Sequence, residues 1–482
     1  MMRRYLCRTT LYAVTTGLAA LGLASCSLAP RSPLPQAEIP VAWPQGAAYA
    51  GASAPAAAAP WQSVFAEPGL QQVIDQALQR NHDLRIAAAN VEQARARYRI
   101  RTAERLPSVD AGLGFERSRV PLPTSLAPVG DSIIVSRFQT DIGISAYEID
   151  LFGRLRNLQD QALARFMATE AASSGMRITV IAETARHYLG LAADQRRLAL
   201  ARQTLESQQR SYDLIDSRHQ AGAVTRLDVH QARTTVEAAR ADVAAFTARV
   251  AQGENALALL AGAQVAPGLL PDARTAVPDA VAGVPPALPS ELLLRRPDVR
   301  EAEFLLASAD ADVGAARAAF FPRITLTAAA GRASEDLSEL FEAGSGIWRF
   351  FPQISVPLFR GGALQANLDA ARAEQQKSVA RYEQAVQVAF RETADALAEL
   401  GTLGARLDSQ NAWVQAASDS LALSDARYRS GADSYITVLV SQRDLYSARM
   451  RLIELEQARA DALVALYRAL GGGWQAPVAG QP

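Results

Sequence analysis

Cysteine, histidine and aromatic residues are scarce in this chain. Of its 482 residues, two are Cys and four are His, and aromatic residues make up 6%. One of the two cysteines lies in an N-terminal segment that export would remove, so the pair cannot build a disulfide framework. The low aromatic content argues against one large packed core. It is typical of long helices that pack through Ala, Leu and Val.

Sequence patterns for catalysis and for nucleic-acid binding are missing as well. Lys and Arg together number 49, as do Asp and Glu, so no basic surplus indicates a nucleic-acid partner. There is no Gly-rich phosphate loop and no nucleophile motif. The His residues lie on separate stretches without metal-ligand spacing (His82, His187, His219 and His230). We therefore expect no enzyme, no catalytic residue, no metal and no cofactor.

The N-terminus has the features of an export signal. Three Arg residues precede an apolar stretch over 11–23, and the tetrapeptide Leu-Ala-Ser-Cys that ends at Cys26 resembles the bacterial lipoprotein signal. This pattern predicts that residues 1–25 are removed and that Cys26 is lipidated, since several acyl chains together give a stable anchor. Ser27 stands where an Asp would retain a lipoprotein in the inner membrane, which favours the outer membrane. The alternative is an ordinary signal peptide in which the Cys occurs by chance.

After this signal the chain contains a long internal duplication. The motif Arg218-His-Gln-Ala-Gly222 corresponds to Arg427-Tyr-Arg-Ser-Gly431, 209 residues later (427 − 218). A repeat of this length indicates two copies of a large unit rather than a solenoid of short ones. We divide the chain into a lipidated, extended arm over 26–66, a first repeat over 67–262, a Pro-rich equatorial linker over 263–290, a second repeat over 291–474 and a flexible tail over 475–482.

Each repeat has the same predicted order of elements. The elements are a helix over 67–105, strands over about 107–117 and 135–149, and helices over 154–220 and 223–262; then a helix over about 298–320, strands over about 322–332 and 347–357, and helices over 361–430 and 432–470. Apolar residues recur every seven positions in the long helices, as at Leu191, Leu198, Leu205 and Tyr212. This spacing predicts coiled-coil packing.

The four predicted strands alternate between apolar and polar residues. One face is expected to hold Val109, Ala111, Leu113 and Phe115, then Phe138, Thr140, Ile142, Ile144 and Ala146. Such alternation over about ten residues is typical of a transmembrane β-barrel strand, and a soluble sheet with one solvated face is the alternative. Pro352 interrupts the fourth run. Four strands are too few to close a barrel, so we expect several subunits to share one.

Four motifs occur in order along the chain and point to a known family. They are Glu148-Ile-Asp-Leu-Phe-Gly-Arg154, Arg295-Arg296-Pro297-Asp298, Arg427-Tyr-Arg-Ser-Gly431 and Ala469-Leu-Gly-Gly-Gly-Trp474. On these residues the chain resembles the TolC/OprM family of outer-membrane efflux channels, and more narrowly its NodT-like lipoprotein subgroup. The resemblance covers nearly all of the mature chain.

The resemblance implies a mainly α-helical fold with a membrane β part. Four strands per subunit would enter a shared 12-stranded barrel of a homotrimer, continued by a long periplasmic α-helical barrel. The implied function is that of the outer-membrane channel of a tripartite efflux pump, a passive exit duct for drugs or other small molecules. Its partners would be a periplasmic adaptor, an inner-membrane pump of the RND type and outer-membrane lipid.

The resemblance also implies a gate at the periplasmic tip, where Gly222 and Gly431 turn the helical hairpins towards the adaptor. In the family an Asp and a Tyr near these turns help to close the tip, and Asp228 and Tyr428 occupy those positions. Two basic family positions near the closed end match Arg427 and Arg443, and the alternative for all four is a solvated helix face.

The aperture departs from the family pattern at two further positions. The family has acidic rings six and nine residues after the second Gly, where this chain has Thr437 and Val440. If these residues line the aperture, we expect it to be less acidic, with weaker cation selectivity and weaker block by divalent cations.

Two other functions fit parts of the sequence. A structural coiled-coil lipoprotein would need the heptads but not the amphipathic strands. An exit duct for secreted polypeptides would keep the channel and change the cargo, and the lipoprotein signal and the OprM-like motifs count against it.

Overall fold

A computed structural model gives the structure of the protein over residues 27–30, 35, 40, 42–50, 54–55, 60–121, 132–275, 283–284, 293–294 and 296–472. The expectations for the signal peptide, for Cys26, for Arg295 and for the C-terminal tail lie outside the described residues. The chain divides into two compact units. The first unit comprises Met1–Pro35, Val91–Thr169 and Ala302–Tyr382, and the second comprises Gln36–Asn90, Glu170–Glu301 and Glu383–Pro482.

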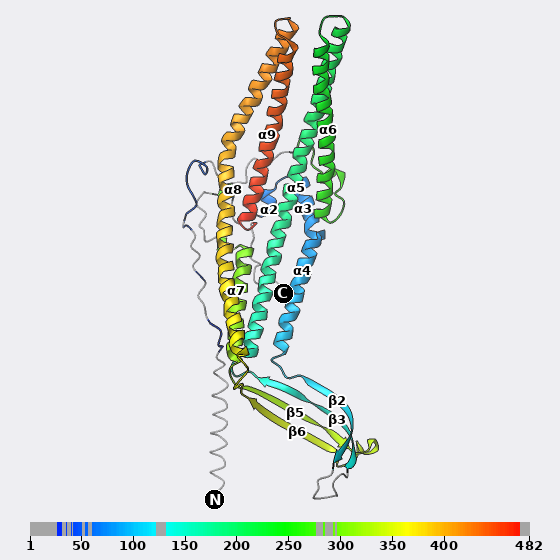
Figure 1. Cartoon of the computed structure of the whole chain (residues 1–482), viewed down its shortest axis with the longest axis vertical. Helices are drawn as coiled ribbons and strands as arrows, with labels where there is room; N and C mark the ends of the chain where they lie inside the picture. Colours follow the sequence, from blue (N-terminus) through cyan, green and yellow to red (C-terminus); the bar gives the residue numbers. More distant parts are fainter. Residues whose placement is uncertain are drawn as a thin grey trace. The chain divides into compact units, whose positions relative to one another are not determined.

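The first unit contains a four-stranded antiparallel sheet in the order β2-β3-β5-β6 (Figure 1). Its strands are β2 (Val109–Pro121), β3 (Ser132–Ile149), β5 (Arg323–Ser334) and β6 (Gly346–Ser355). The central pair, β3 with β5, joins the two repeats. Among the described strands, β2 and β6 have a partner on one side only.

One face of this sheet is apolar and exposed. A row of paired residues crosses all four strands from Val109 through Ile144 and Ala328 to Phe350. On the same face Leu113 is 77% exposed and Trp348 is 81% exposed, although such residues usually avoid water. The adjacent row runs from Asp110 through Gly143 and Ala329 to Arg349, so the opposite face is more polar.

A β-bulge interrupts the regular alternation that was expected for β3. The register with β5 shifts between Ile144 and Tyr147, and Ala146 has φ 50°, which is rare for a residue with a side chain. The extra residue moves Tyr147 onto the apolar face opposite Leu326, so the assignment of Ala146 to that alternation is wrong. Pro352 lies within β6, an edge strand, where a missing N–H donor is tolerated.

The junction between β3 and the following helix gives the Glu148–Arg154 motif a structural role. The Arg154 guanidinium donates two hydrogen bonds to the Glu148 carboxylate, at 2.9 and 2.7 Å, and Arg323 approaches the same carboxylate to within 3.2 Å. Phe152 stacks on Phe321 with ring centroids 4.8 Å apart. These contacts fasten the end of β3 to the start of β5 beside the helix.

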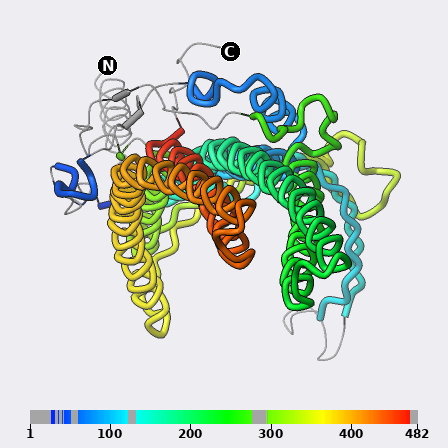
Figure 2. Tube along the Cα trace, turned by 90° about the horizontal axis from the view of Figure 1, so that it is seen from above, coloured from blue at the N-terminus to red at the C-terminus, as the bar shows by residue number. Residues whose placement is uncertain are grey.

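The second unit is built mainly from two helical hairpins (Figures 1 and 2). One pairs α5 (Arg154–Gln220) with α6 (Arg226–Ala261), and the other pairs α8 (Ala363–Arg429) with α9 (Tyr435–Ala469). Both α5 and α8 begin in the first unit and have 67 residues, or about 100 Å at the usual rise per residue. No helix within the described part of the chain is long and apolar enough to cross a membrane.

The main core of this unit surrounds the middle of α5. Tyr188 and Leu191 of α5 are buried against Leu70 and Leu257 and against the last turns of α9. Phe65 meets Tyr467 edge-on, with ring centroids 5.3 Å apart. The short helices α2 (Trp61–Val64) and α3 (Pro68–Arg80) contribute to this core. Two further helices, α4 (His82–Ala103) and α7 (Pro297–Ala318), belong mostly to the first unit.

The helix expected over 67–105 is in fact two helices, and Asn81 separates them. Its side-chain oxygen accepts hydrogen bonds from the backbone N–H groups of Asp83 and Leu84, at 2.9 and 3.1 Å. Its side-chain amide donates to the Leu260 carbonyl at 2.9 Å. Asn is a strong helix N-cap. The break between α3 and α4 also places the buried Asn81 side chain where it can bind the Leu260 carbonyl of α6. The expectation of one continuous helix was therefore wrong.

The Pro-rich arm is packed against the body at its described residues. Trp43 stacks on Phe390 of α8 with ring centroids 4.9 Å apart, and Tyr49 packs against Leu397. Gly401 of α8 allows this approach, because a Cβ there would lie 2.1 Å from the Ala48 carbonyl oxygen. Strands β1 (Ala54–Pro55) and β4 (Gly283–Val284) pair the arm with the linker. These contacts hold the described part of the arm against α8 and the linker.

Candidate gate at the helical hairpin turns

The first hairpin turns at Gly222, which has φ 74°. The N–H groups of Gly222 and Ala223 donate to the carbonyls of His219 and Arg218 at 2.8 Å each, which ends α5 in a glycine cap. Asp228 lies in the first turn of α6 and forms a capping box with Thr225. Its carboxylate accepts from the Thr225 N–H at 2.9 Å and from the Thr225 hydroxyl at 2.7 Å. Asp228 is thus engaged within its own turn.

The second hairpin has the same backbone turn with different side chains. Gly431 has φ 76°, and the N–H of Ala432 donates to the Arg427 carbonyl at 2.9 Å. Arg427 forms a bidentate ion pair with Asp433 in its own turn, at 2.6 and 2.9 Å. This hydrogen bond lowers the pKa of Asp433 below its usual range.

One sequence difference between the two repeats allows Arg218, but not the equivalent Arg427, to contact the other hairpin. Arg218 and Arg427 correspond in the duplication, as do Val224 and Asp433. Since Val224 offers no carboxylate, Arg218 instead donates to the Tyr428 hydroxyl at 3.1 Å. Its guanidinium lies 5.4 Å from the centre of the Tyr428 ring, within range of a cation–π contact. This contact connects the end of α5 with the end of α8.

An apolar cluster supports this contact between the hairpins. Ile215, Tyr435 and Val438 are buried there, and the Tyr428 ring lies 5.4 Å from the Tyr435 ring. Burial raises the pKa of Tyr435 to about 12, so its hydroxyl is neutral at physiological pH. Tyr428 was among the residues predicted for the gate, whereas its partner Arg218 and the buried Tyr435 were not. Alignment of the two repeats could have revealed Arg218, because Asp433 beside Arg427 corresponds to Val224 and leaves Arg218 without a carboxylate in its own turn.

A second set of polar contacts links the hairpins further along the helices. Gln208 of α5 donates to Gln442 of α9 at 3.1 Å and accepts from Thr235 of α6 at 2.9 Å. Tyr446 of α9 donates to Asp242 of α6 at 2.8 Å, and burial is the largest cause of the raised pKa of Tyr446. These residues join three of the four long helices.

The remaining gate candidates lie on α9 near this network. Thr437 and Val440 are exposed, and Arg443 contacts its neighbour Asp444 at 3.2 Å. Val440 and Arg443 line a groove of about 480 Å³ between α6 and α9. The structure therefore brings Tyr428 together with Arg218, whereas Asp228 and Arg427 are held within their own turns.

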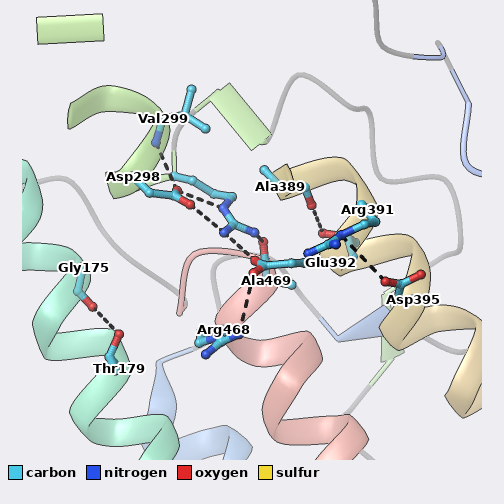
Figure 3. A network of polar contacts seen from close by, with 12 residues as sticks. Gly175, Thr179, Asp298, Val299, Ala389, Arg391, Glu392, Asp395, Arg468 and Ala469 are labelled. Atoms are coloured by element: carbon cyan, nitrogen blue, oxygen red, sulfur yellow. Dashed lines mark hydrogen bonds and ion pairs between the residues drawn. The ribbon is translucent and has the colours of Figure 1, made fainter. Parts of the chain in front are cut away.

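The Arg-Pro-Asp motif forms an ion cluster around the buried side chain of Arg296, and Figure 3 shows Asp298, Glu392 and Ala469 of this cluster. Arg296 donates to Asp298 at 3.0 and 2.7 Å, to Glu392 of α8 at 2.8 Å and to the Ala469 carbonyl of α9 at 2.7 Å. Burial lowers the pKa of Arg296, but the two carboxylates outweigh it and leave the pKa raised. Gly471 and Gly472, both with positive φ, end α9 beside this cluster.

None of the described residues forms a group of His, Cys, Asp and Glu that could hold a metal ion. The titratable groups near the turns serve as caps, ion pairs or hydrogen-bond partners between helices. These contacts hold neighbouring helices together, so their loss would allow the helices to separate.

Comparison with known proteins decides the family. Residues 73–263 and 288–472 match the family described as outer membrane efflux protein. The chain belongs to the outer membrane efflux protein family. The solvent efflux pump outer membrane protein SrpC of Pseudomonas putida is 48% identical over 410 residues, covering 85% of this chain and 86% of SrpC.

Solved structures agree with this family. A crystal structure of a membrane protein from Pseudomonas aeruginosa has a TM-score of 0.87 and 39% identity, and the match covers 92% of this chain and 100% of that one. The open state of the MtrE outer membrane channel of Neisseria gonorrhoeae has a TM-score of 0.79 and 32% identity, with 93% and 98% covered.

These findings confirm several predictions for this outer membrane efflux protein. The resemblance to the efflux-channel family, the mainly helical fold with a small sheet, the outer-membrane location with a periplasmic extension and the role as the outer-membrane component of an efflux pump are all confirmed. The relatives are efflux and channel proteins rather than enzymes. As a component of a pump, the protein works with other pump proteins.

Proposed function

We propose that three copies of this chain form one outer-membrane channel, the passive exit duct of a tripartite efflux pump. One observation supports the shared channel above all: a four-stranded sheet with an exposed apolar face, whose edge strands β2 and β6 each pair on one side only within the described part of the chain. A membrane sheet must satisfy all its backbone groups, which only a closed barrel achieves. Three sheets joined β6 to β2 give twelve strands, above the minimum of eight.

In this proposal the helical hairpins continue the duct into the periplasm and close it at their turns. The turns at Gly222 and Gly431 face an adaptor protein, and an inner-membrane pump of the RND type supplies the energy. The duct itself only opens and closes. The contact of Arg218 with Tyr428 is our first candidate for the lock, and Asp228, Arg427 and Arg443 shape the turns and the groove around it.

We infer that the cargo consists of small organic molecules, including drugs and apolar solvents. SrpC, named as a solvent efflux protein, supports this cargo through 48% identity over most of both chains. We further propose that Cys26 is lipidated and anchors the chain in the outer membrane. The tetrapeptide ending at that Cys supports the anchor.

Reconstitution and deletion test the proposed duct together. The purified protein is expected to run as a heat-modifiable trimer and to give discrete single-channel steps in a planar bilayer. A deletion strain is expected to become more sensitive to organic solvents and apolar drugs, and the intact gene is expected to restore resistance. Protein that forms no conducting trimer would instead support a structural lipoprotein. Normal resistance together with loss of a secreted polypeptide would support polypeptide export.

If Thr437 and Val440 line the aperture, their replacement by Asp should increase its cation selectivity. Thr437 and Val440 are exposed one turn apart on α9, so Thr437→Asp with Val440→Asp would add six carboxylates per proposed trimer. We expect reversal potentials in a salt gradient to move towards cation selectivity, and Ca²⁺ to block the variant more strongly. Ala245→Asp with Ala248→Asp is the control, because both residues are exposed on α6, have the same spacing and add the same charge. Equal shifts in the control would mean that Thr437 and Val440 do not line the aperture.

A further inference from the structure

The residues that follow Cys26 directly are bound to the first unit. Ser27 donates from its hydroxyl to the Asn157 side-chain oxygen at 2.8 Å, and Asn157 lies in the first turn of α5. Arg317, in the last turn of α7, donates to the Leu28 carbonyl at 3.2 Å. The Ala29 N–H donates back to the Ser27 hydroxyl at 3.3 Å, which folds the segment into a short turn.

A glycine of α7 provides the space for this segment. A Cβ at Gly314 would lie 2.8 Å from the backbone N and Cα of Ala29 and 2.8 Å from Asn157 Cγ. Since such a separation is too short for carbon and nitrogen atoms in contact, any other residue at 314 would displace the segment. Glycine is unfavourable inside a helix, and here the close approach of Ala29 accounts for it.

Asn157 retains a hydrogen-bond donor at the same place. Its side chain is completely buried, and its amide nitrogen has no hydrogen-bond partner among the described residues. A buried donor without a partner is unfavourable. The side chain already accepts from Ser27, so the unused donor lies beside the bound segment and is available to a carbonyl of the N-terminal chain.

The binding residues lie close in sequence to the membrane strands. Asn157 comes eight residues after the end of β3 at Ile149, and Arg317 comes six residues before the start of β5 at Arg323. The segment is therefore held where the helices meet the sheet. Residue 26 is joined to Ser27 by one peptide bond.

We propose that Asn157, Gly314 and Arg317 form a docking site for this chain's own segment Ser27–Pro30. Docking fixes the acyl chains of Cys26 at the level where the sheet enters the membrane, and this couples lipidation to insertion of the sheet. The proposal rests on the proposed lipid anchor. Docking differs from anchoring through a long tether, because a lipid on a long tether would have no fixed position relative to the strands.

The test uses full-length protein expressed in a strain that lacks the native copy. Three readouts are taken: palmitate incorporation, maleimide labelling of Ala29→Cys in purified protein, and the amount of heat-modifiable trimer in the outer membrane. We expect Gly314→Leu to leave palmitate incorporation unchanged, to raise the labelling rate of the new thiol about tenfold through release of the segment, and to lower the trimer several-fold. Asn157→Ala is expected to raise the labelling rate and to lower the amount of trimer as well, each by a smaller factor.

Gly404→Leu is the matched control, because Gly404 is also a helical glycine and a Cβ there would meet nothing within 4 Å. It is expected to behave as the unchanged protein in all three readouts. Labelling of Gly314→Leu at the control rate overturns the docking site, whatever happens to the trimer. Normal trimer despite a released segment overturns the coupling. Absence of palmitate from the unchanged protein overturns the lipid anchor. Because the Cys26 thiol would then also react with maleimide, labelling is assigned to residue 29 by mass spectrometry of the labelled peptide, so that it still reports on docking separately.

Discussion

Replacement of Arg218 by Ala is expected to open the closed duct. Its hydrogen bond to Tyr428 and its position over the Tyr428 ring connect the two hairpins. Such a pair of contacts is worth about 1–2 kcal/mol, and three copies in the proposed trimer together contribute about 3–6 kcal/mol. As about 1.4 kcal/mol changes an equilibrium constant tenfold, we expect the open probability in planar bilayers to rise at least about tenfold.

Arg427→Ala is the matched control for Arg218→Ala. Arg427 is the equivalent residue in the second repeat, but its partner Asp433 lies in the same turn. Its loss is therefore expected to loosen that turn and to change the open probability little. Tyr428→Phe should lie between the two, because the ring contact remains and the hydroxyl is lost. If Arg427→Ala opened the channel and Arg218→Ala did not, the lock would depend on the second turn and our assignment would be wrong.

Replacement of Arg296 by Met is expected to destabilise the protein and to reduce its assembly. The Arg296 side chain, 7% exposed, forms ion pairs with Asp298 and Glu392 and donates to the Ala469 carbonyl at the end of α9. Met fills a similar volume but leaves Glu392, which is three-quarters buried, without this partner. Loss of one member of a buried ion cluster costs about 3 kcal/mol or more. The temperature at which the detergent-solubilised protein unfolds should fall, and less trimer should reach the outer membrane.

Arg468→Met provides the comparison for this variant. Arg468 approaches the same Glu392 at 3.7 Å, but its side chain is 46% exposed. An exposed pair of this kind contributes about 0–1 kcal/mol, so we expect a small change in unfolding temperature. Equal effects of the two substitutions would show that general loss of positive charge near Glu392, rather than the buried cluster, causes the destabilisation. The double substitution Arg296→Met with Glu392→Gln should recover part of the loss.

Periodic patterns in the sequence indicated the fold class, and four short motifs indicated the family through their resemblance to it. The heptads of α5 and α8 and the alternation in the four strands needed no tertiary information, because each recurs with the period of its element. The motif at 295–298 has no period and carries information only through its resemblance to a family. The glycines at 222 and 431 also marked the turns correctly, since both adopt positive φ. These features suffice to identify an outer membrane efflux protein.

Tertiary contacts decided what these patterns could not. The bulge at Ala146, the helix break at Asn81 and the packing of Trp43 on Phe390 depend on neighbours distant in the chain, and no local period encodes them. The same holds at the turns, where Arg218 and Arg427 look alike in sequence. Only the structure shows that Asp433 engages one arginine locally and leaves the other to join the two hairpins. A side chain's partner is set by which groups folding brings within reach, so equivalent residues acquired different roles.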